Sequence, residues 1–251
     1  ASEAALLSRL HWWTVEFGLV GTPADFKLYG AGLLSSVGES KACMSPEVEK
    51  VPLSVKCAEV DYDITNMQPQ LFVARNFQHL IDVLEEFADG MCFRKGGADS
   101  VQRVMDSENV GTCVYSSGLQ VSGVFTQLLR DAEGHETYIG TSGPTQLSYN
   151  DSQLEGHGTD AHPDGFGSPV GTLKNTDVPL EDCTDGDLLA SGIEAQQNVR
   201  LEFNSGVVVQ GYLERLQRRN GKLLLMRFGN CSVTGPEGET LFKPAFGPYD
   251  M

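Results

Sequence analysis

Glu16 is the first residue whose type and setting could support chemistry. It follows two indoles, Trp12 and Trp13, inside the almost wholly apolar run 11–19. A carboxylate is costly to bury unless it is paired or bound to a cation, so Glu16 is a candidate metal ligand. The alternative is a helix-end glutamate that points into solvent, because glutamate is almost never fully buried without a partner.

A second group of metal-ligating residue types lies in the stretch 156–171, which is dense in Gly, Pro, Asp and His. His157 and His162 are separated by four residues, and Asp160 and Asp164 lie nearby. Imidazole and carboxylate groups could hold a divalent metal of their own. A long loop of this composition is also more often functional than an ordinary connection. The alternative is a solvated or hydrogen-bonded loop that binds no metal.

The sequence around Glu16 resembles the pterin-dependent aromatic amino acid hydroxylases. Three motifs carry the resemblance, which is dense from residue 10 to residue 88: Trp-Trp-Thr-Val-Glu-Phe-Gly-Leu at 12–19, Tyr-Gly-Ala-Gly-Leu-Leu-Ser-Ser at 29–36 and Gln-Pro at 68–69. It implies that Glu16 is the carboxylate of a 2-His-1-carboxylate iron site. It also implies Fe(II) and tetrahydrobiopterin as cofactors, and an aromatic amino acid and O₂ as substrates, with phenylalanine converted to tyrosine. Tyrosine and tryptophan remain open as alternative substrates.

The family's two imidazole ligands come from a helical H-x4-H motif that precedes this region, and nothing before Ser8 supplies it. His157 and His162 have the same spacing, but they follow Glu16 in a stretch rich in helix breakers, so we do not expect them to be the iron pair. The chain also begins with Ala1 and ends without a tail at Met251. We therefore expect a piece of a longer polypeptide, which is inactive alone.

The resemblance implies roles for further side chains. The residues expected to line the amino acid pocket are Trp12, Gly32, Ser35 and Tyr62. His11 replaces a tyrosine that lies near the pterin in the animal enzymes, and Glu39 matches a carboxylate behind the metal ligands. Glycine at position 32 would let the backbone approach a ligand closely. The alternatives are a turn glycine, a capping serine and an indole that packs in the core, and for Trp13 we expect the core.

The elements that position Glu16 follow from caps and periodicity. Ser2 is a candidate N-cap for a helix over 2–17 that ends at Gly18. Asn76 is a candidate N-cap for a helix over 77–88. Strands or extended segments are expected at 51–60, 62–65 and 68–73. The apolar positions of the second helix, which predict its buried face, are Phe77, Leu80, Ile81, Leu84 and Phe87.

The sequence changes character near residue 90 and becomes β-rich. Strands are expected at 112–124, 136–140, 145–149, 199–203, 207–216, 223–228 and 232–234, and a short acidic helix at 180–189. Ser205-Gly206 and Asn220-Gly221 are the predicted tight turns. The spacing of the last strands predicts a small barrel at 197–243.

The expected fold class is α+β, with two domains. Residues 1–90 would be the C-terminal part of a mostly helical hydroxylase catalytic domain, and residues 91–251 a β-rich extension. The second part resembles the extended C-terminal region of longer bacterial members of the family. The alternative is that residues 91–251 form a non-enzymatic ligand-sensing or protein-interaction module.

Composition indicates which kinds of partner to expect and in which cellular compartment the protein functions. The formal charge of −16 repels phosphate backbones, so we expect no nucleic acid partner. No apolar run reaches the roughly 20 residues of a membrane span. The six cysteines are scattered, which is typical of reduced thiols in a cytoplasmic protein. A heptad tetramerisation helix is not found in the sequence, and the oligomeric state is left open.

Overall fold

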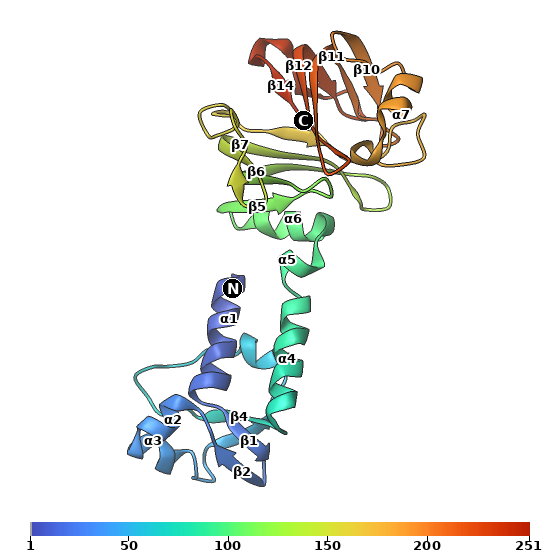
Figure 1. Cartoon of the computed structure of the whole chain (residues 1–251). Coiled ribbons are helices and arrows are strands. Elements are labelled where there is room, and N and C mark those ends of the chain that lie inside the picture. The colour runs from blue at the N-terminus through green and yellow to red at the C-terminus, as the bar shows by residue number, and fades with distance from the viewer. Residues whose placement is uncertain (1) are drawn as a thin grey trace. The chain divides into compact units, whose positions relative to one another are not determined.

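The computed structural model describes residues 2–251. The chain divides into two compact units, unit 1 up to Lys95 and unit 2 from Gly96 to Met251 (Figure 1). Each unit combines helices with β-sheet, which confirms the predicted α+β class. Among the described residues, no helix is both long enough and apolar enough to cross a bilayer.

Unit 1 is built on a small sheet of strand order β2-β1-β4-β3. Its strands are β1 Leu19–Thr22, β2 Asp25–Leu28, β3 Glu49–Pro52 and β4 Gln70–Ala74. Its helical segments are α1 Glu3–His11, the π-helical turn Trp12–Glu16, α2 Ala31–Ser35, α3 Val37–Ala42, the 3₁₀ turn Val55–Glu59, α4 Phe77–Asp89 and α5 Cys92–Lys95. β1 is antiparallel to β2 and parallel to β4, and β3 is parallel to β4.

The two predicted helices of unit 1 are confirmed, with their caps. The Ser2 hydroxyl accepts a hydrogen bond from Ala5 N at 3.2 Å, and Asn76 Oδ1 accepts one from His79 N at 2.8 Å. The π-helical turn at the end of the first helix was not predicted. There the Phe17 N–H donates to the Trp12 carbonyl at 2.9 Å, one residue further back than in an α-helix.

Two of the predicted strands in unit 1 are wrong. Over 51–60, the strand ends at Pro52 and a 3₁₀ turn follows, because proline has no N–H to continue a ladder. Residues 62–65 form no strand, since the Asp63 carboxylate accepts hydrogen bonds from Thr65 N at 2.7 Å and from Asn66 Nδ2 at 2.7 Å. Such local side-chain bonds favour a turn over an extended backbone.

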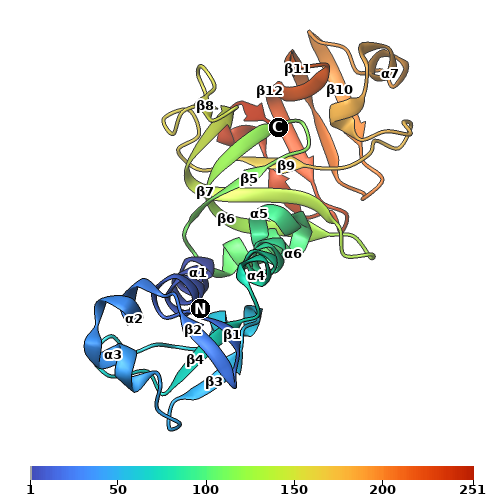
Figure 2. The ribbon, with the colours of Figure 1, turned by 60° about the horizontal axis from the view of Figure 1, so that its bottom comes forward.

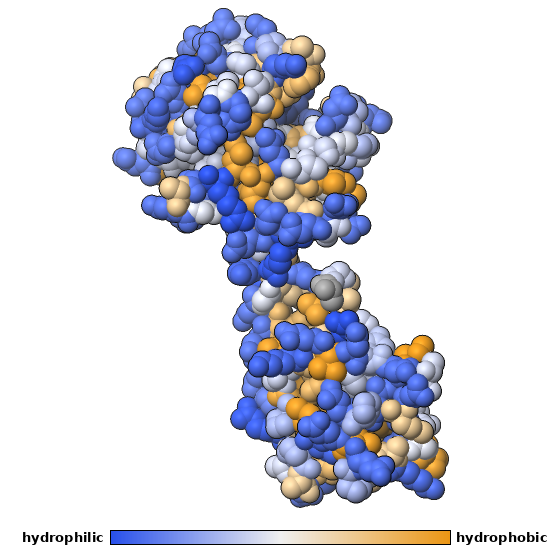
Figure 3. Space-filling view, turned by 180° about the vertical axis from the view of Figure 1, so that it is seen from behind, coloured by the Kyte–Doolittle hydropathy of each residue, from blue (hydrophilic) through white to orange (hydrophobic). Residues whose placement is uncertain are grey.

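The buried face of α4 also differs from the prediction. Val83 is 3% exposed, and Leu80 and Phe87 are partly buried, whereas Ile81 is 51% exposed and Phe77 and Leu84 are similarly exposed. Positions 80, 83 and 87 form one stripe, and 77, 81 and 84 form a neighbouring stripe on the same wide apolar face. Periodicity predicts this face but not which edge of it packs. Hydrophobic side chains therefore reach the surface among polar ones (Figure 3).

Unit 2 contains two five-stranded antiparallel sheets, which lie next to each other (Figure 2). The first sheet contains β5 Val110–Val114, β6 Leu119–Arg130, β7 Glu136–Tyr149, β8 Ser152–Gln153 and β9 Gly167–Pro169. The second contains β10 Gln197–Glu202, β11 Val208–Arg219, β12 Lys222–Thr234, β13 Thr240–Phe242 and β14 Tyr249–Asp250. The helical segments are α6 Gly97–Asp106, α7 Asp185–Ala190 and the 3₁₀ turns Leu180–Asp182 and Pro244–Phe246.

Several strands of unit 2 are longer than predicted, because bulges interrupt their alternation without ending them. The segments 136–140 and 145–149 are one strand, β7, with Gly143 at φ +68° and a register shift opposite Ser122 and Val124. The segments 223–228 and 232–234 are likewise one strand, β12, with Asn230 at φ +45°. A bulge adds one residue and reverses the in–out pattern beyond it.

Two helical predictions in unit 2 also need correction. The helix α6 was not predicted, since glycine at its N-cap, Gly96, and at its first position, Gly97, is typical of a linker. The expected helix over 180–189 is split, because Thr184 begins a new helix, α7, with a reciprocal capping box to Asp187.

The tight turn at Asn220-Gly221 is confirmed, with φ values of +49° and +83°. The barrel at 197–243 stays a prediction.

We predict that two adjacent leucines of α2 respond very differently to truncation. Leu33 is 0% exposed and Leu34 is 63% exposed. Leu33→Ala should lower the free energy of unfolding of unit 1 by about 2–5 kcal/mol, through lost burial and a cavity. Leu34→Ala should change it by less than about 0.5 kcal/mol. Both tryptophans lie in unit 1, so their fluorescence during urea unfolding measures this unit; equal effects would contradict the packing described.

Candidate functional site

Glu16 closes the π-helical turn and is half-buried. Its carboxylate lies against the backbone of α2. A Cβ atom added to Gly32 would lie 3.3 Å from Glu16 Oε2, 3.1 Å from the Glu16 carbonyl oxygen and 2.9 Å from Phe17 Cε2. The structure therefore brings Gly32 and Glu16 together, as expected from the sequence, and glycine leaves the carboxylate side of this contact open.

Two further glycines bring the backbone of the Glu16 turn close to its neighbours. A side chain at Gly30 would collide with the Glu16 carbonyl oxygen, and one at Gly18 would collide with the Thr14 carbonyl oxygen. The Gly18 carbonyl accepts hydrogen bonds from Tyr29 N at 3.3 Å and from Gly30 N at 3.0 Å. Glu16 is thus positioned by backbone packing between the first helix and the start of α2.

Trp12 and Tyr62 also come together, as part of an aromatic stack beside Glu16. The Trp12 ring stacks on Tyr62 at 4.3 Å between centroids and on Phe17 at 4.5 Å. The Tyr62 hydroxyl lies 3.1 Å from the Ser8 hydroxyl. Trp13 is in the core, as expected, and its Nε1 donates to the Val60 carbonyl at 2.8 Å. Phe17, a member of this stack, shares with the Glu16 carboxylate the contact at Gly32.

The remaining predicted residues are less closely associated with the carboxylate. The Ser35 hydroxyl is exposed and donates to the Gly32 carbonyl at 3.1 Å. Glu39 lies in the first turn of α3, where burial raises the pKa of its carboxyl. His11 is exposed at the end of α1. Among residues 2–251, the group of side chains close enough to share a metal ion does not include Glu16.

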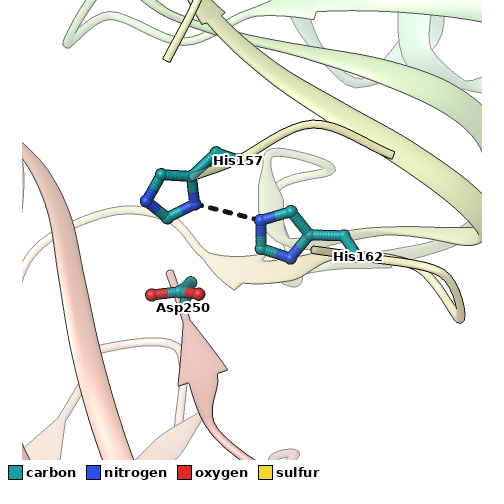
Figure 4. Close-up of side chains that lie close together, drawn as sticks. All are labelled: His157, His162 and Asp250. Carbon is teal, nitrogen blue, oxygen red and sulfur yellow. Dashed lines mark hydrogen bonds between the residues drawn. The ribbon is translucent and has the colours of Figure 1, made fainter. Parts of the chain in front are cut away.

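That group consists of His157, His162 and Asp250, which we call the His–Asp cluster (Figure 4). One ligand atom from each lies within 4.8 Å of the others. All three side chains are buried, with exposed fractions of 2%, 8% and 8%. The structure therefore excludes the solvated loop that the sequence left open for the two histidines.

Backbone hydrogen bonds hold both histidines against β7. The His157 carbonyl accepts from Leu147 N at 2.9 Å, and the His162 carbonyl accepts from Thr145 N at 3.0 Å. This docking turns the imidazoles inward, where His157 Nδ1 lies 3.1 Å from His162 Nε2. The predicted partners Asp160 and Asp164 are exposed and do not belong to the cluster.

Arginine side chains border the cluster. Arg227 Nη1 donates to Asp250 Oδ2 at 3.0 Å, and Arg215 Nη2 lies 3.5 Å from His157 Nε2. Burial lowers the pKa of both imidazoles below the ordinary value; the Asp250 carboxylate opposes this shift. A lowered pKa favours the neutral imidazole, which is the form in which histidine binds metals.

Asp250 was missed from the sequence. It lies in β14, which pairs with β12 through Arg227 and Phe228, far along the chain from the two histidines. A two-residue strand after a 3₁₀ turn carries no periodic signal. The sequence offers only an acidic residue after an aromatic one, Tyr249, which the structure shows to be buried.

Comparison with known proteins finds similarity over unit 1. Residues 1–95 match the family model described as biopterin-dependent aromatic amino acid hydroxylase. Phenylalanine-4-hydroxylase of Dictyostelium discoideum is 39% identical over 88 residues, which are 35% of this chain and 20% of that protein. Phenylalanine-4-hydroxylase of Chromobacterium violaceum is 42% identical over 79 residues, which are 31% of this chain and 27% of that protein.

A solved structure matches a similar share of this chain. The iron- and phenylalanine-bound crystal structure of phenylalanine hydroxylase from Chromobacterium violaceum is 36% identical, covering 35% of this chain and 37% of that chain, with a TM-score of 0.31. The chain spans only about a fifth of the length of the first curated relatives, 20% and 18%. Residues 1–95 of this chain are thus similar to the biopterin-dependent aromatic amino acid hydroxylases, and this similarity covers unit 1 only.

Proposed function

We propose that unit 1 is the C-terminal part of the catalytic domain of an Fe(II)- and tetrahydrobiopterin-dependent monooxygenase that converts phenylalanine to tyrosine with O₂. The β-rich unit 2 follows it as an extension. The observation that carries the proposal is the half-buried Glu16 carboxylate, held against Gly32 and beside the Trp12 stack. We also propose a cytoplasmic location, because the six cysteines are free thiols.

Each of these residues has a defined part in the proposed site. Glu16 supplies one anionic oxygen ligand, and Gly32 leaves room beside it for a ligand to approach. Trp12 and Tyr62 form an apolar wall suited to an aromatic ring, since aromatic pairs favour stacked or edge contacts. Fe(II) and the pterin, when bound, supply the activation of O₂.

The residues of this chain do not make a complete iron site by themselves. In the described residues, Glu16 has no imidazole partner within metal-sharing distance. The indole N–H of Trp12 is also buried without a hydrogen-bond acceptor among these residues, which normally costs about 1–3 kcal/mol. Both facts support the proposal that the two histidine ligands, and a partner for Trp12, come from outside these 251 residues.

A second function is favoured for unit 2 by a separate observation. A cavity of about 410 Å³ lies in this unit, with aromatic and polar side chains in its wall. Residues lining it include Tyr138, His162, Phe166, Phe242, Phe246 and Asp250. The lining of this cavity is slightly more polar than apolar, and convergent polar groups beside aromatic walls can fix the orientation of a small ligand. We propose that unit 2 binds a small ligand here, a non-enzymatic function that is compatible with the hydroxylase.

We predict that the 251-residue chain alone does not hydroxylate phenylalanine. A single carboxylate holds Fe(II) too weakly, because such sites use two imidazoles as well. The measurement is tyrosine formation by the purified chain with Fe(II), a tetrahydropterin, phenylalanine and O₂. The control is a whole phenylalanine hydroxylase in the same assay. Turnover above background by the chain would mean that it supplies the missing ligands itself.

We predict that Glu16→Gln in the full-length protein removes iron and activity. Glutamine keeps the shape but loses the anion, so hydroxylation should fall by roughly 100-fold or more, given that even residues behind metal ligands contribute about 10–100-fold. The free energy of unfolding should change by less than about 0.5 kcal/mol. Iron per subunit, activity and melting temperature are measured together. Glu59→Gln, at an exposed glutamate, is the matched control; wild-type iron and activity in Glu16→Gln would refute the assignment.

We predict that Gly32→Ala damages the site while Gly38→Ala does not, although both glycines lie in short helices. The added methyl at position 32 meets Phe17 and the Glu16 carboxylate, whereas at position 38 it meets the flexible end of Met67 at 3.2 Å. Gly32→Ala in the full-length protein should lower hydroxylation at least about tenfold, since a shift of about 1 Å can cost 100-fold. Gly38→Ala should keep activity and gain up to about 1 kcal/mol of helix stability. Equal activity in the two variants would contradict the role of Gly32.

A further inference from the structure

The His–Asp cluster has the composition of a metal site and lies entirely within unit 2. It contains two imidazoles and one carboxylate, all buried. Such groups are rarely placed together in a protein interior unless they are paired or bind a metal. The cluster plays no part in the hydroxylase proposed for unit 1.

The distance between the two imidazole nitrogens is suitable for both to bind the same metal ion. His157 Nδ1 and His162 Nε2 are 3.1 Å apart. With metal–nitrogen bonds of about 2.0–2.1 Å, two nitrogens at this separation subtend an angle of about 100° at the metal. This angle lies between the octahedral and tetrahedral values. The planes of the two rings are nearly parallel, 15° apart.

Two arginines and a second carboxylate surround the cluster. Arg227 approaches Asp250, but its Nε also pairs with Glu214 at 3.4 Å. A carboxylate has two oxygens and about four lone-pair directions, so Asp250 can accept from Arg227 and still bind a metal. Arg227 then holds the carboxylate in place, as groups behind metal ligands commonly do. Arg215 lies on the Nε2 side of His157, whereas Nδ1 faces His162.

Three protein ligands leave coordination positions open. His162 and Asp250 both belong to the wall of the 410 Å³ cavity, so these positions are accessible to a small molecule. The ligand types also select the metal: imidazole favours zinc and neighbouring transition metals, whereas magnesium and calcium prefer oxygen ligands alone.

We propose that His157, His162 and Asp250 bind one divalent transition-metal ion of the zinc class, with open coordination positions towards the cavity of unit 2. Zinc is the test ion, and cobalt is its spectroscopic substitute. The proposal does not depend on the iron site proposed for Glu16, and the experiments can separate the two.

The test uses the full 251-residue chain, stripped with a chelator and then dialysed against micromolar Zn²⁺. Elemental analysis should give one zinc per chain, and the melting temperature of unit 2, followed by circular dichroism, should rise with zinc. His162→Gln and Asp250→Asn should each weaken zinc binding at least about tenfold and abolish the thermal shift. Millimolar Mg²⁺ should not displace the zinc.

Two controls isolate the cluster. His135→Gln changes an exposed histidine that lies near Asp131 and Glu133, and Glu16→Gln changes the proposed iron ligand; both should bind zinc as the wild type does. If either cluster variant fails to fold, the visible spectrum of the cobalt-loaded wild-type chain decides. A cobalt spectrum that differs from that of aqueous cobalt supports the site, and a spectrum identical to that of aqueous cobalt overturns it. Absence of zinc from the wild type, or undiminished zinc in both folded cluster variants, also overturns the proposal.

Discussion

The contact between the backbone of Glu16 and the glycines of the following loop is the constraint on which unit 1 depends. A side chain at Gly30 or Gly18 would collide with backbone oxygen atoms of the turn that contains Glu16. The first helix can therefore approach α2 only where side chains are missing. The widened π-helical turn fits this geometry, because it displaces the backbone by one residue just before Gly18. The position of the carboxylate is thus a property of the main chain.

Local signals in the sequence predicted much of the fold. Ser2 and Asn76 cap their helices as expected, and Asn220-Gly221 forms the expected tight turn. These features depend on a few neighbouring residues, so the sequence alone contains the necessary information. The errors arose where tertiary contacts decide: bulges join predicted strands into β7 and β12, and packing selects one edge of the apolar face of α4.

The two candidate sites differ in the same way. Gly32 and Glu16 lie in two neighbouring sequence motifs that the family resemblance placed in one site, and the structure brings them into contact. The His–Asp cluster joins a loop after β7 to the last strand of unit 2, and no spacing rule connects residues that far apart. The predicted carboxylates Asp160 and Asp164 share the loop with the histidines but lie on its exposed side. The residues of the cluster could therefore not be identified from closeness in sequence, because the pairing of β14 with β12 brings Asp250 to the histidines.

The strand β12 has a run of four buried residues, Leu223 to Met226, that contribute to two different cores. Leu224 and Leu225 pack with the first sheet of unit 2, and Leu223 and Met226 with the second. Separation of either sheet would expose the core of the other to solvent, because β12 contributes buried residues to both cores. We therefore expect the two sheets of unit 2 to unfold together, and the central amides of β12 to be among the slowest of this unit to exchange with solvent.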